Sequence, residues 1–156
     1  MQISSFKNHG KSGFQNCSLI AVICYLFSLP IPDLRAQPFD AAWISAASGA
    51  WTDVNRWNTF GFLPFPNNDS QDEFNVSIAL DASPTIQLSI DIEVVNLELA
   101  AGFVQGNATL TAEDRFLWRG GGFTGGNGQL IAPQKVTMTS GNKNLRSFNI
   151  INAREA

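Results

Sequence analysis

The chain contains very few of the residues that most catalytic and metal sites use. It has two cysteines, one histidine and one tyrosine in 156 residues, and all four lie within the first 36: Cys17, Cys24, His9 and Tyr25. The rest of the chain can therefore form no disulfide, no cysteine or histidine metal site and no histidine-based catalytic triad. Without disulfides, its stability must come from packing, and we expect no cofactor.

Charged residues are also scarce, at 15% of the chain, and the formal net charge is −3. Without the first 36 residues the charge becomes −5, because Lys7, Lys11 and Arg35 are removed together with Asp33. The remaining basic residues do not cluster, so the chain offers no electrostatic surface for a phosphate backbone. Nucleic acid is excluded as an expected partner.

Long hydrophobic runs are absent except for one near the N-terminus. The apolar stretch Cys17–Leu29 follows the weakly basic segment Lys7–Lys11 and precedes Pro30. Its 13 residues are too few to cross a hydrocarbon core of ~30 Å as a helix. We interpret residues 1–36 as a secretory signal cleaved between Ala36 and Gln37, which predicts a secreted or cell-surface protein. The alternative is an uncleaved signal, which would then be the only contact with a membrane.

Helical periodicity is weak after the signal, whereas short strand patterns are frequent. Apolar and polar residues alternate over Phe74–Ile78 and again over Ile86–Ile92, the pattern of half-buried strands. Glycine-rich segments at Gly120–Gly122 and Gly125–Gly128 are expected to form corners. These features predict an all-β fold, with further strands near 97–99, 108–111, 116–118, 129–131, 136–138 and 147–151.

A repeated motif indicates how these strands are arranged. The spacing apolar-x-x-Gly-Asn-x-x-Leu occurs three times, the first two copies 20 residues apart and the third 15 residues later: Phe103/Gly106-Asn107/Leu110, Phe123/Gly126-Asn127/Leu130 and Met138/Gly141-Asn142/Leu145. Repeats of this length are typical of a β-solenoid, in which each turn buries its apolar face by stacking on the next. Stacking would place the three leucines in one buried column and the three asparagines in another at a corner.

An antiparallel β-sandwich is the alternative, in which the Gly-Asn pairs are ordinary hairpin turns. We predict the solenoid: a short right-handed parallel β-helix. Residues 37–72 would form an aromatic-rich N-terminal cap, and residues 73–156 would form the rungs, of which we expect the last to be incomplete.

Several stretches of the chain resemble one group of exported proteins. They are Trp51–Trp57 with the strand over Pro66–Val76, the stretch Leu97–Leu110, and Phe116–Leu130 with its Gly-Gly-Gly and Gly-Gly-Asn-Gly turns. The pattern resembles the large bacterial right-handed β-helix proteins with adhesin-like, autotransporter-type repeats. The resemblance implies an exported scaffold in which architecture is better specified than activity. The present chain is shorter than these proteins, and we expect it to be a truncated member of the group.

Two groups of residues are candidate binding sites. Trp43, Trp51 and Trp57 could present flat aromatic faces to sugar rings, or they could instead form the solenoid's cap or core. Asp69, Asp72 and Glu73 place three carboxylates within five residues, which could hold calcium, or could be solvated turn acids. We favour the cap for the tryptophans and turn acids for the carboxylates, and we predict no metal site.

These observations predict a non-enzymatic scaffold or adhesin-like surface or matrix module that contacts polysaccharide or cell-surface components along a strand face. One alternative is a polysaccharide-active β-helix enzyme, a lyase or hydrolase, that could use calcium together with Arg115 or Arg119. Its carboxylates would come from Asp91, Glu93, Glu98, Glu113 and Asp114. Another alternative is a truncated fragment of a larger exported protein, which would self-associate through its terminal rung.

Overall fold

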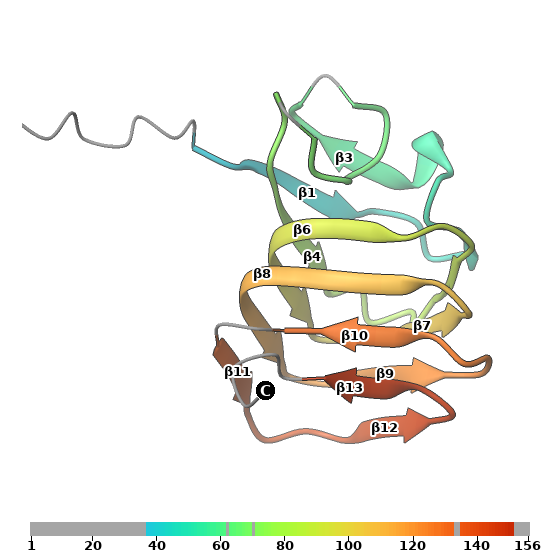
Figure 1. The fold of residues 1–156 in the computed structure, drawn as a ribbon. Helices are drawn as coiled ribbons and strands as arrows, with labels where there is room; N and C mark the ends of the chain where they lie inside the picture. Colours follow the sequence, from blue (N-terminus) through green and yellow to red (C-terminus); the bar gives the residue numbers. More distant parts are fainter. Residues whose placement is uncertain (1–36, 62, 70, 133–134, 152–156) are drawn as a thin grey trace, which may run out of the picture. The chain divides into compact units, whose positions relative to one another are not determined.

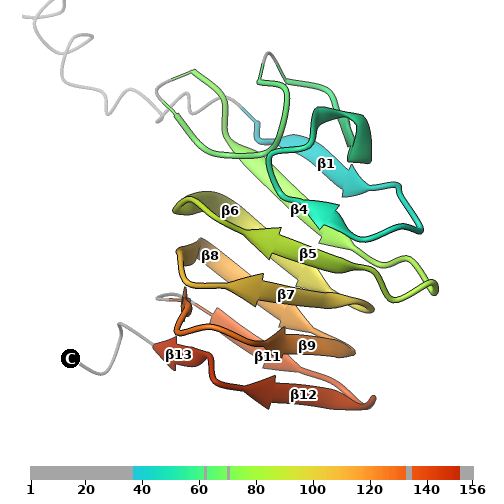
Figure 2. The same cartoon turned by 90° about the vertical axis from the view of Figure 1, so that its right-hand side faces the viewer.

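The chain winds into a β-solenoid of about four turns, seen from the side in Figure 1 and Figure 2. The computed structural model describes residues 37–61, 63–69, 71–132 and 135–151; the predicted signal (1–36) lies outside them. None of the described residues forms a helix long and apolar enough to cross a membrane. The elements are β1 (Phe39–Trp43), β2 (Gly49–Ala50), the 3-10 helix η1 (Val54–Arg56), β3 (Trp57–Thr59), β4 (Phe74–Ile78), β5 (Thr85–Leu88), β6 (Ile92–Leu99), β7 (Phe103–Gly106), β8 (Thr109–Trp118), β9 (Gly121–Thr124), β10 (Gln129–Ile131), β11 (Lys135–Met138), β12 (Lys143–Arg146) and β13 (Asn149–Ile151).

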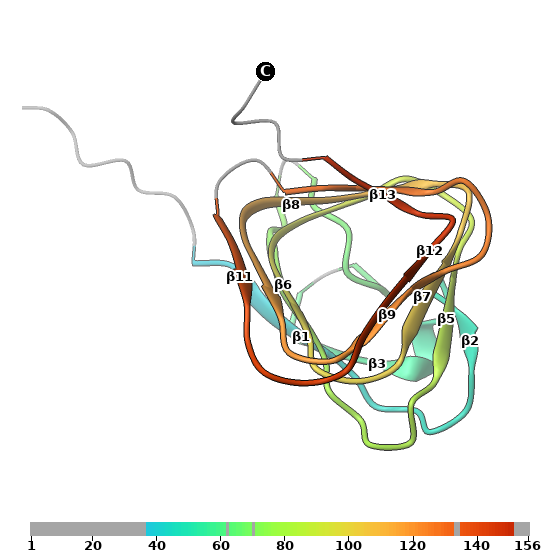
Figure 3. The same ribbon diagram turned by 90° about the horizontal axis from the view of Figure 1, so that it is seen from below.

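The solenoid has a triangular cross-section with three walls (Figure 3). Wall 1 contains the first halves of β6 and β8 with β10 and β13, and wall 2 contains the second halves of β6 and β8 with β3, β1, β4 and β11. Wall 3 contains β2, β5, β7, β9 and β12. The two long strands turn the corner between walls 1 and 2 at a register shift between Val94 and Asn96. All pairings are parallel among the described strands except β1 with β3.

The core is built from columns of side chains at equivalent positions on successive turns. In wall 1 the column is Ile92, Leu110, Leu130 and Ile150, at separations of 18, 20 and 20 residues along the chain. In wall 2 it is Ala41, Val76, Leu97, Phe116 and Val136, and in wall 3 it is Ile86, Val104, Phe123 and Leu145. The residues of the inner turns are buried, so each turn covers the apolar face of its neighbour.

The predicted stacking is confirmed for two of the three motif copies. Leu110 and Leu130 are parallel neighbours and both are fully buried, and the Asn127 backbone N–H donates to Asn107 Oδ1 at 2.8 Å across the corner. The predicted stacking of the third copy is wrong. Leu145 pairs with Phe123 in wall 3 and is 47% exposed, and Ile150 occupies the position that Leu145 was expected to fill. A 15-residue step is too short for a full turn of this solenoid, so the third Gly-Asn pair lies at a different corner.

Two local expectations also differ from the structure. The alternating run Ile86–Ile92 is not one strand, because β5 ends at Leu88 and Ile90 is 43% exposed in the corner before β6. The predicted glycine corner at Gly120–Gly122 is partly a strand, β9. Glycine is required there because a Cβ on Gly121 or Gly122 would overlap a backbone carbonyl of the adjacent turn, that of Gly102 or Asn144.

Candidate functional site

Three tryptophans predicted as a cap or a sugar platform form one cluster at the N-terminal turns. Trp43, Trp51 and Trp57 are 2%, 0% and 5% exposed. The Trp57 ring lies 5.1 Å from that of Trp43 and 4.9 Å from that of Trp51, measured between centroids. Each indole N–H donates to a backbone carbonyl, those of Ser45, Pro66 and Trp51 for Trp43, Trp51 and Trp57 respectively. Their ring faces are covered by protein, which leaves no room for a sugar.

A charged loop closes over this cluster. Arg56 Nε lies 2.8 Å from Asp53 Oδ2, and its guanidinium also donates to Ser45 Oγ and the Ala47 carbonyl. Asp53 Oδ1 accepts from the Asn55 backbone N–H and caps η1. The Asn55 hydrogen bond and the Arg56 side chain together hold the pKa of Asp53 below its ordinary value of 3.8.

Acid is therefore expected to loosen this loop. Because the folded-state pKa of Asp53 is lower than its unfolded value, its stabilising contribution is present above 3.8 and is lost as the pH falls through the folded pKa. In Asp53→Asn, the free energy of unfolding should fall less steeply than in the wild type as the pH is lowered below 3.8. Urea unfolding followed by tryptophan fluorescence at several pH values would measure this. The exposed Asp81→Asn is the matched control. An equal loss of unfolding free energy at low pH in the wild type and in Asp53→Asn would contradict this prediction.

The three acidic residues predicted as calcium candidates make separate hydrogen bonds within the protein. Asp69 Oδ1 accepts from the backbone N–H groups of Asp72 and Gln71, which lower the pKa of Asp69. Asp72 is 1% exposed, and its Oδ2 accepts from the Leu63 backbone N–H. Glu73 is half-buried, and its carbonyl accepts from the Phe39 backbone N–H. Among the described residues, no group of three or more acidic, cysteine or histidine side chains is arranged to hold a metal.

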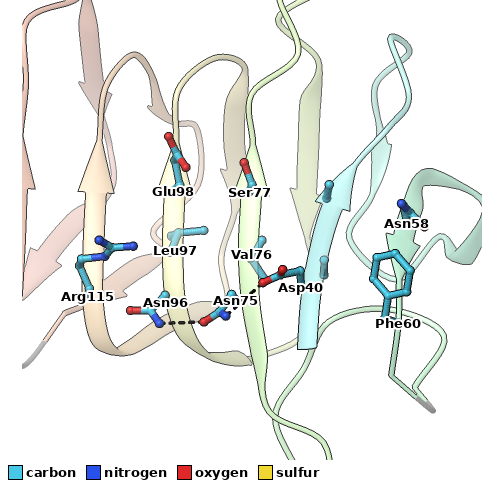
Figure 4. A pocket seen from close by; sticks show the side chains of 12 residues that line it. Asp40, Asn58, Phe60, Asn75, Val76, Ser77, Asn96, Leu97, Glu98 and Arg115 are labelled. Carbon is cyan, nitrogen blue, oxygen red and sulfur yellow. Dashed lines mark hydrogen bonds between the residues drawn. The ribbon is translucent and has the colours of Figure 1, made fainter. Parts of the chain in front are cut away.

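A groove on the outer surface of wall 2 is the best-defined site (Figure 4). It has a volume of about 440 Å³ and crosses β3, β1, β4, β6 and β8, so it runs along the solenoid axis. Its floor is a row of polar side chains at equivalent positions on neighbouring strands: Asp40, Asn75, Asn96 and Arg115. Neighbouring strands are spaced at ~4.8 Å, so the row is about 14 Å long.

Hydrogen bonds order most of this polar row. Asn96 Nδ2 donates to Asn75 Oδ1 at 2.7 Å, and Asn75 Nδ2 donates to Asp40 Oδ1 at 3.1 Å. Each amide group has two donor hydrogens and an oxygen with two lone pairs, so both asparagines keep hydrogen-bonding capacity for a ligand. Because the side chains are already held in place, a ligand would lose less entropy in ordering them.

An aromatic side chain and a second charged pair border the row. Phe60, just after β3, is 72% exposed and lines the groove at the end nearest Asp40. Glu98, one of the acids considered for catalysis, also lines the groove, and its Oε1 lies 2.8 Å from Arg119 Nε. The groove therefore combines amides, opposite charges and one open aromatic face.

The other acids considered for catalysis lie outside this groove. Asp91 and Glu93 line a separate polar hollow, where Asp91 Oδ1 accepts from the Thr109 backbone N–H. Glu113 Oε2 accepts from Asn68 Nδ2 at 3.4 Å, and Asp114 is exposed at the corner before Arg115. These positions do not converge with Glu98 in the groove.

Comparison with known proteins finds no matching family model, no similar curated protein and no similar solved structure.

Proposed function

We propose that this protein is an exported, non-enzymatic β-solenoid module of the bacterial cell surface or extracellular matrix, and that it contacts polysaccharide along wall 2. The right-handed β-helix resemblance and the predicted signal support the exported, adhesin-like part of this proposal. The observation that carries the polysaccharide contact is the row Asp40, Asn75, Asn96 and Arg115 in an axial groove, in which hydrogen bonds order the first three side chains.

The composition of the groove matches the chemistry of a sugar chain. Sugar hydroxyl groups both donate and accept hydrogen bonds, as do the amides of Asn75 and Asn96. The C–H face of a sugar ring is apolar and can pack on an exposed aromatic ring such as Phe60. An extended polymer could also contact several solenoids at once, so weak contacts would add through multivalency.

Binding of polysaccharides by the purified, exported full-length product tests this function. Asn96→Ala is expected to weaken binding about threefold to tenfold, because one or two uncharged hydrogen bonds are lost. Gln87→Ala is the matched control, since Gln87 is an exposed amide on wall 3. Affinity electrophoresis over neutral and acidic polysaccharides would measure the effect. No binding by the wild type, or equal loss in both variants, would contradict the proposal.

The same material tests the predicted export signal and the alternatives. We expect mass spectrometry to show a mature N-terminus at Gln37; an intact Met1 in the membrane fraction would show an uncleaved signal instead. Release of new sugar ends from the bound polysaccharide would favour the enzyme alternative. In the final turn, Met138, Leu145 and Ile151 are 57%, 47% and 42% exposed, and sedimentation would test self-association there.

A further inference from the structure

The groove on wall 2 is electrically polarised along the solenoid axis. Asp40 lies at the end nearest Phe60, two amides occupy the middle, and Arg115 lies at the other end. The register continues the row to Lys135, which pairs with Arg115 on the next turn and is exposed. Two cations therefore follow two neutral amides, and the nearest member of the row with negative charge is three strands from Arg115.

Arg115, which lines the groove, differs from Arg119 and Arg56 in having no internal partner among the described residues. Arg119 binds Glu98 and Arg56 binds Asp53, each at 2.8 Å. Within the described part of the chain, Arg115 makes no salt bridge and no side-chain hydrogen bond, and it is exposed. Its planar guanidinium retains the donor pair that suits a carboxylate, and Asn96 beside it can hydrogen-bond the adjoining hydroxyl group.

The groove also discriminates against negative charge at its other end. A carboxylate near Asp40 would face a like charge, whereas a neutral ring there could pack on Phe60. The charge of Glu98, which also lines the groove, is balanced by Arg119. An acidic sugar unit should therefore bind at the Arg115 end of the groove and not at the Asp40 end.

We propose that the groove binds an acidic polysaccharide that contains both carboxylate-bearing and neutral sugar units, with a carboxylate at Arg115 and a neutral ring at Phe60. This proposal rests on the proposed polysaccharide contact and specifies its ligand class and direction. Lys135 would strengthen the attraction one turn further along the same row.

The test uses the full-length exported protein and two matched probes: a tetrasaccharide of alternating glucuronate and N-acetylglucosamine, and the neutral tetrasaccharide made by reducing its carboxylates to alcohols. Calorimetry at low and moderate salt would measure both affinities. We expect the acidic probe to bind about tenfold more tightly, and Arg115→Gln to remove most of that difference. Added salt should weaken the binding of the acidic probe and leave the binding of the neutral probe unchanged.

Arg146→Gln is the control, because it removes one exposed positive charge on β12 in wall 3. It should leave both affinities unchanged. Equal binding of the two probes, or an acidic preference that survives Arg115→Gln, would overturn the acidic-ligand proposal while leaving polysaccharide contact in place. Failure of both probes together with the whole polysaccharide panel would instead overturn the proposed function itself.

Discussion

Replacing Leu130 by alanine is expected to lower the free energy of unfolding by about 3 kcal/mol. Leu130 is fully buried between Leu110 and Ile150 in the column of wall 1, so the shortened side chain leaves a cavity between stacked turns. Urea unfolding followed by tryptophan fluorescence would measure the change.

Leu145→Ala is the matched control for this substitution, because both leucines end a copy of the same sequence motif. Leu145 is 47% exposed in the final turn, and its replacement should cost less than about 1 kcal/mol. Equal costs for the two variants would mean that all three motif copies are buried alike, which would contradict the assignment of Leu145 to wall 3.

A single methyl group added at Gly126 should lower the free energy of unfolding by about as much as Leu130→Ala. Gly126 has φ +81°, and a Cβ there would overlap the Gly106 carbonyl oxygen on the adjacent turn. The same oxygen accepts from the Gly128 backbone N–H, so the corner cannot move away without losing a hydrogen bond between turns. We expect Gly126→Ala to cost roughly 3 kcal/mol, the sum of the backbone strain and the displaced contact.

Gly125→Ala separates these two contributions. Gly125 also has a positive φ, +66°, but a Cβ there would meet only the flexible side chain of Gln105. This variant should cost about 1 kcal/mol, the strain alone. Equal unfolding free energies for the two variants would show that the adjacent turn does not lie against Gly126.

The sequence was sufficient to predict the fold class because the stacking signal is local and repeated. The motif around Asn107 and Asn127 contains a corner and the start of a buried strand, so two copies at the right spacing predict stacked turns. The third copy led to a wrong placement of Leu145, because its spacing of 15 residues was accepted as a full turn. Its true successor in the column, Ile150, carries no Gly-Asn pair and could not be recognised by pattern.

The glycine-rich strand β9 illustrates a second limit of sequence reasoning. Gly121 and Gly122 are typical turn residues, yet they lie in a strand because the backbone of neighbouring turns approaches them too closely for any side chain. Only the packed neighbours reveal this requirement. Local preference was overridden by contacts with residues about 20 positions away.

The groove could not be assembled from the sequence, because its members share no motif. Asp40, Asn75, Asn96 and Arg115 become neighbours only through the strand register, and β6 and β8 contain an irregularity that shifts it. One signal was present: Asn75 and Asn96 each precede an apolar residue that enters the core column, Val76 or Leu97. Aligning these two pairs at a separation of one turn would have predicted the amide ladder.

Equivalent residues of successive turns lie directly above one another in parallel strands, and the whole fold depends on this stacking. Nuclear Overhauser contacts in the isotope-labelled full-length protein test it most directly at β8, β10 and β13. We expect parallel, in-register backbone contacts that link Leu110 to Leu130 and Leu130 to Ile150. Close contacts between Hα atoms of facing residues, the signature of antiparallel hairpins, would contradict it.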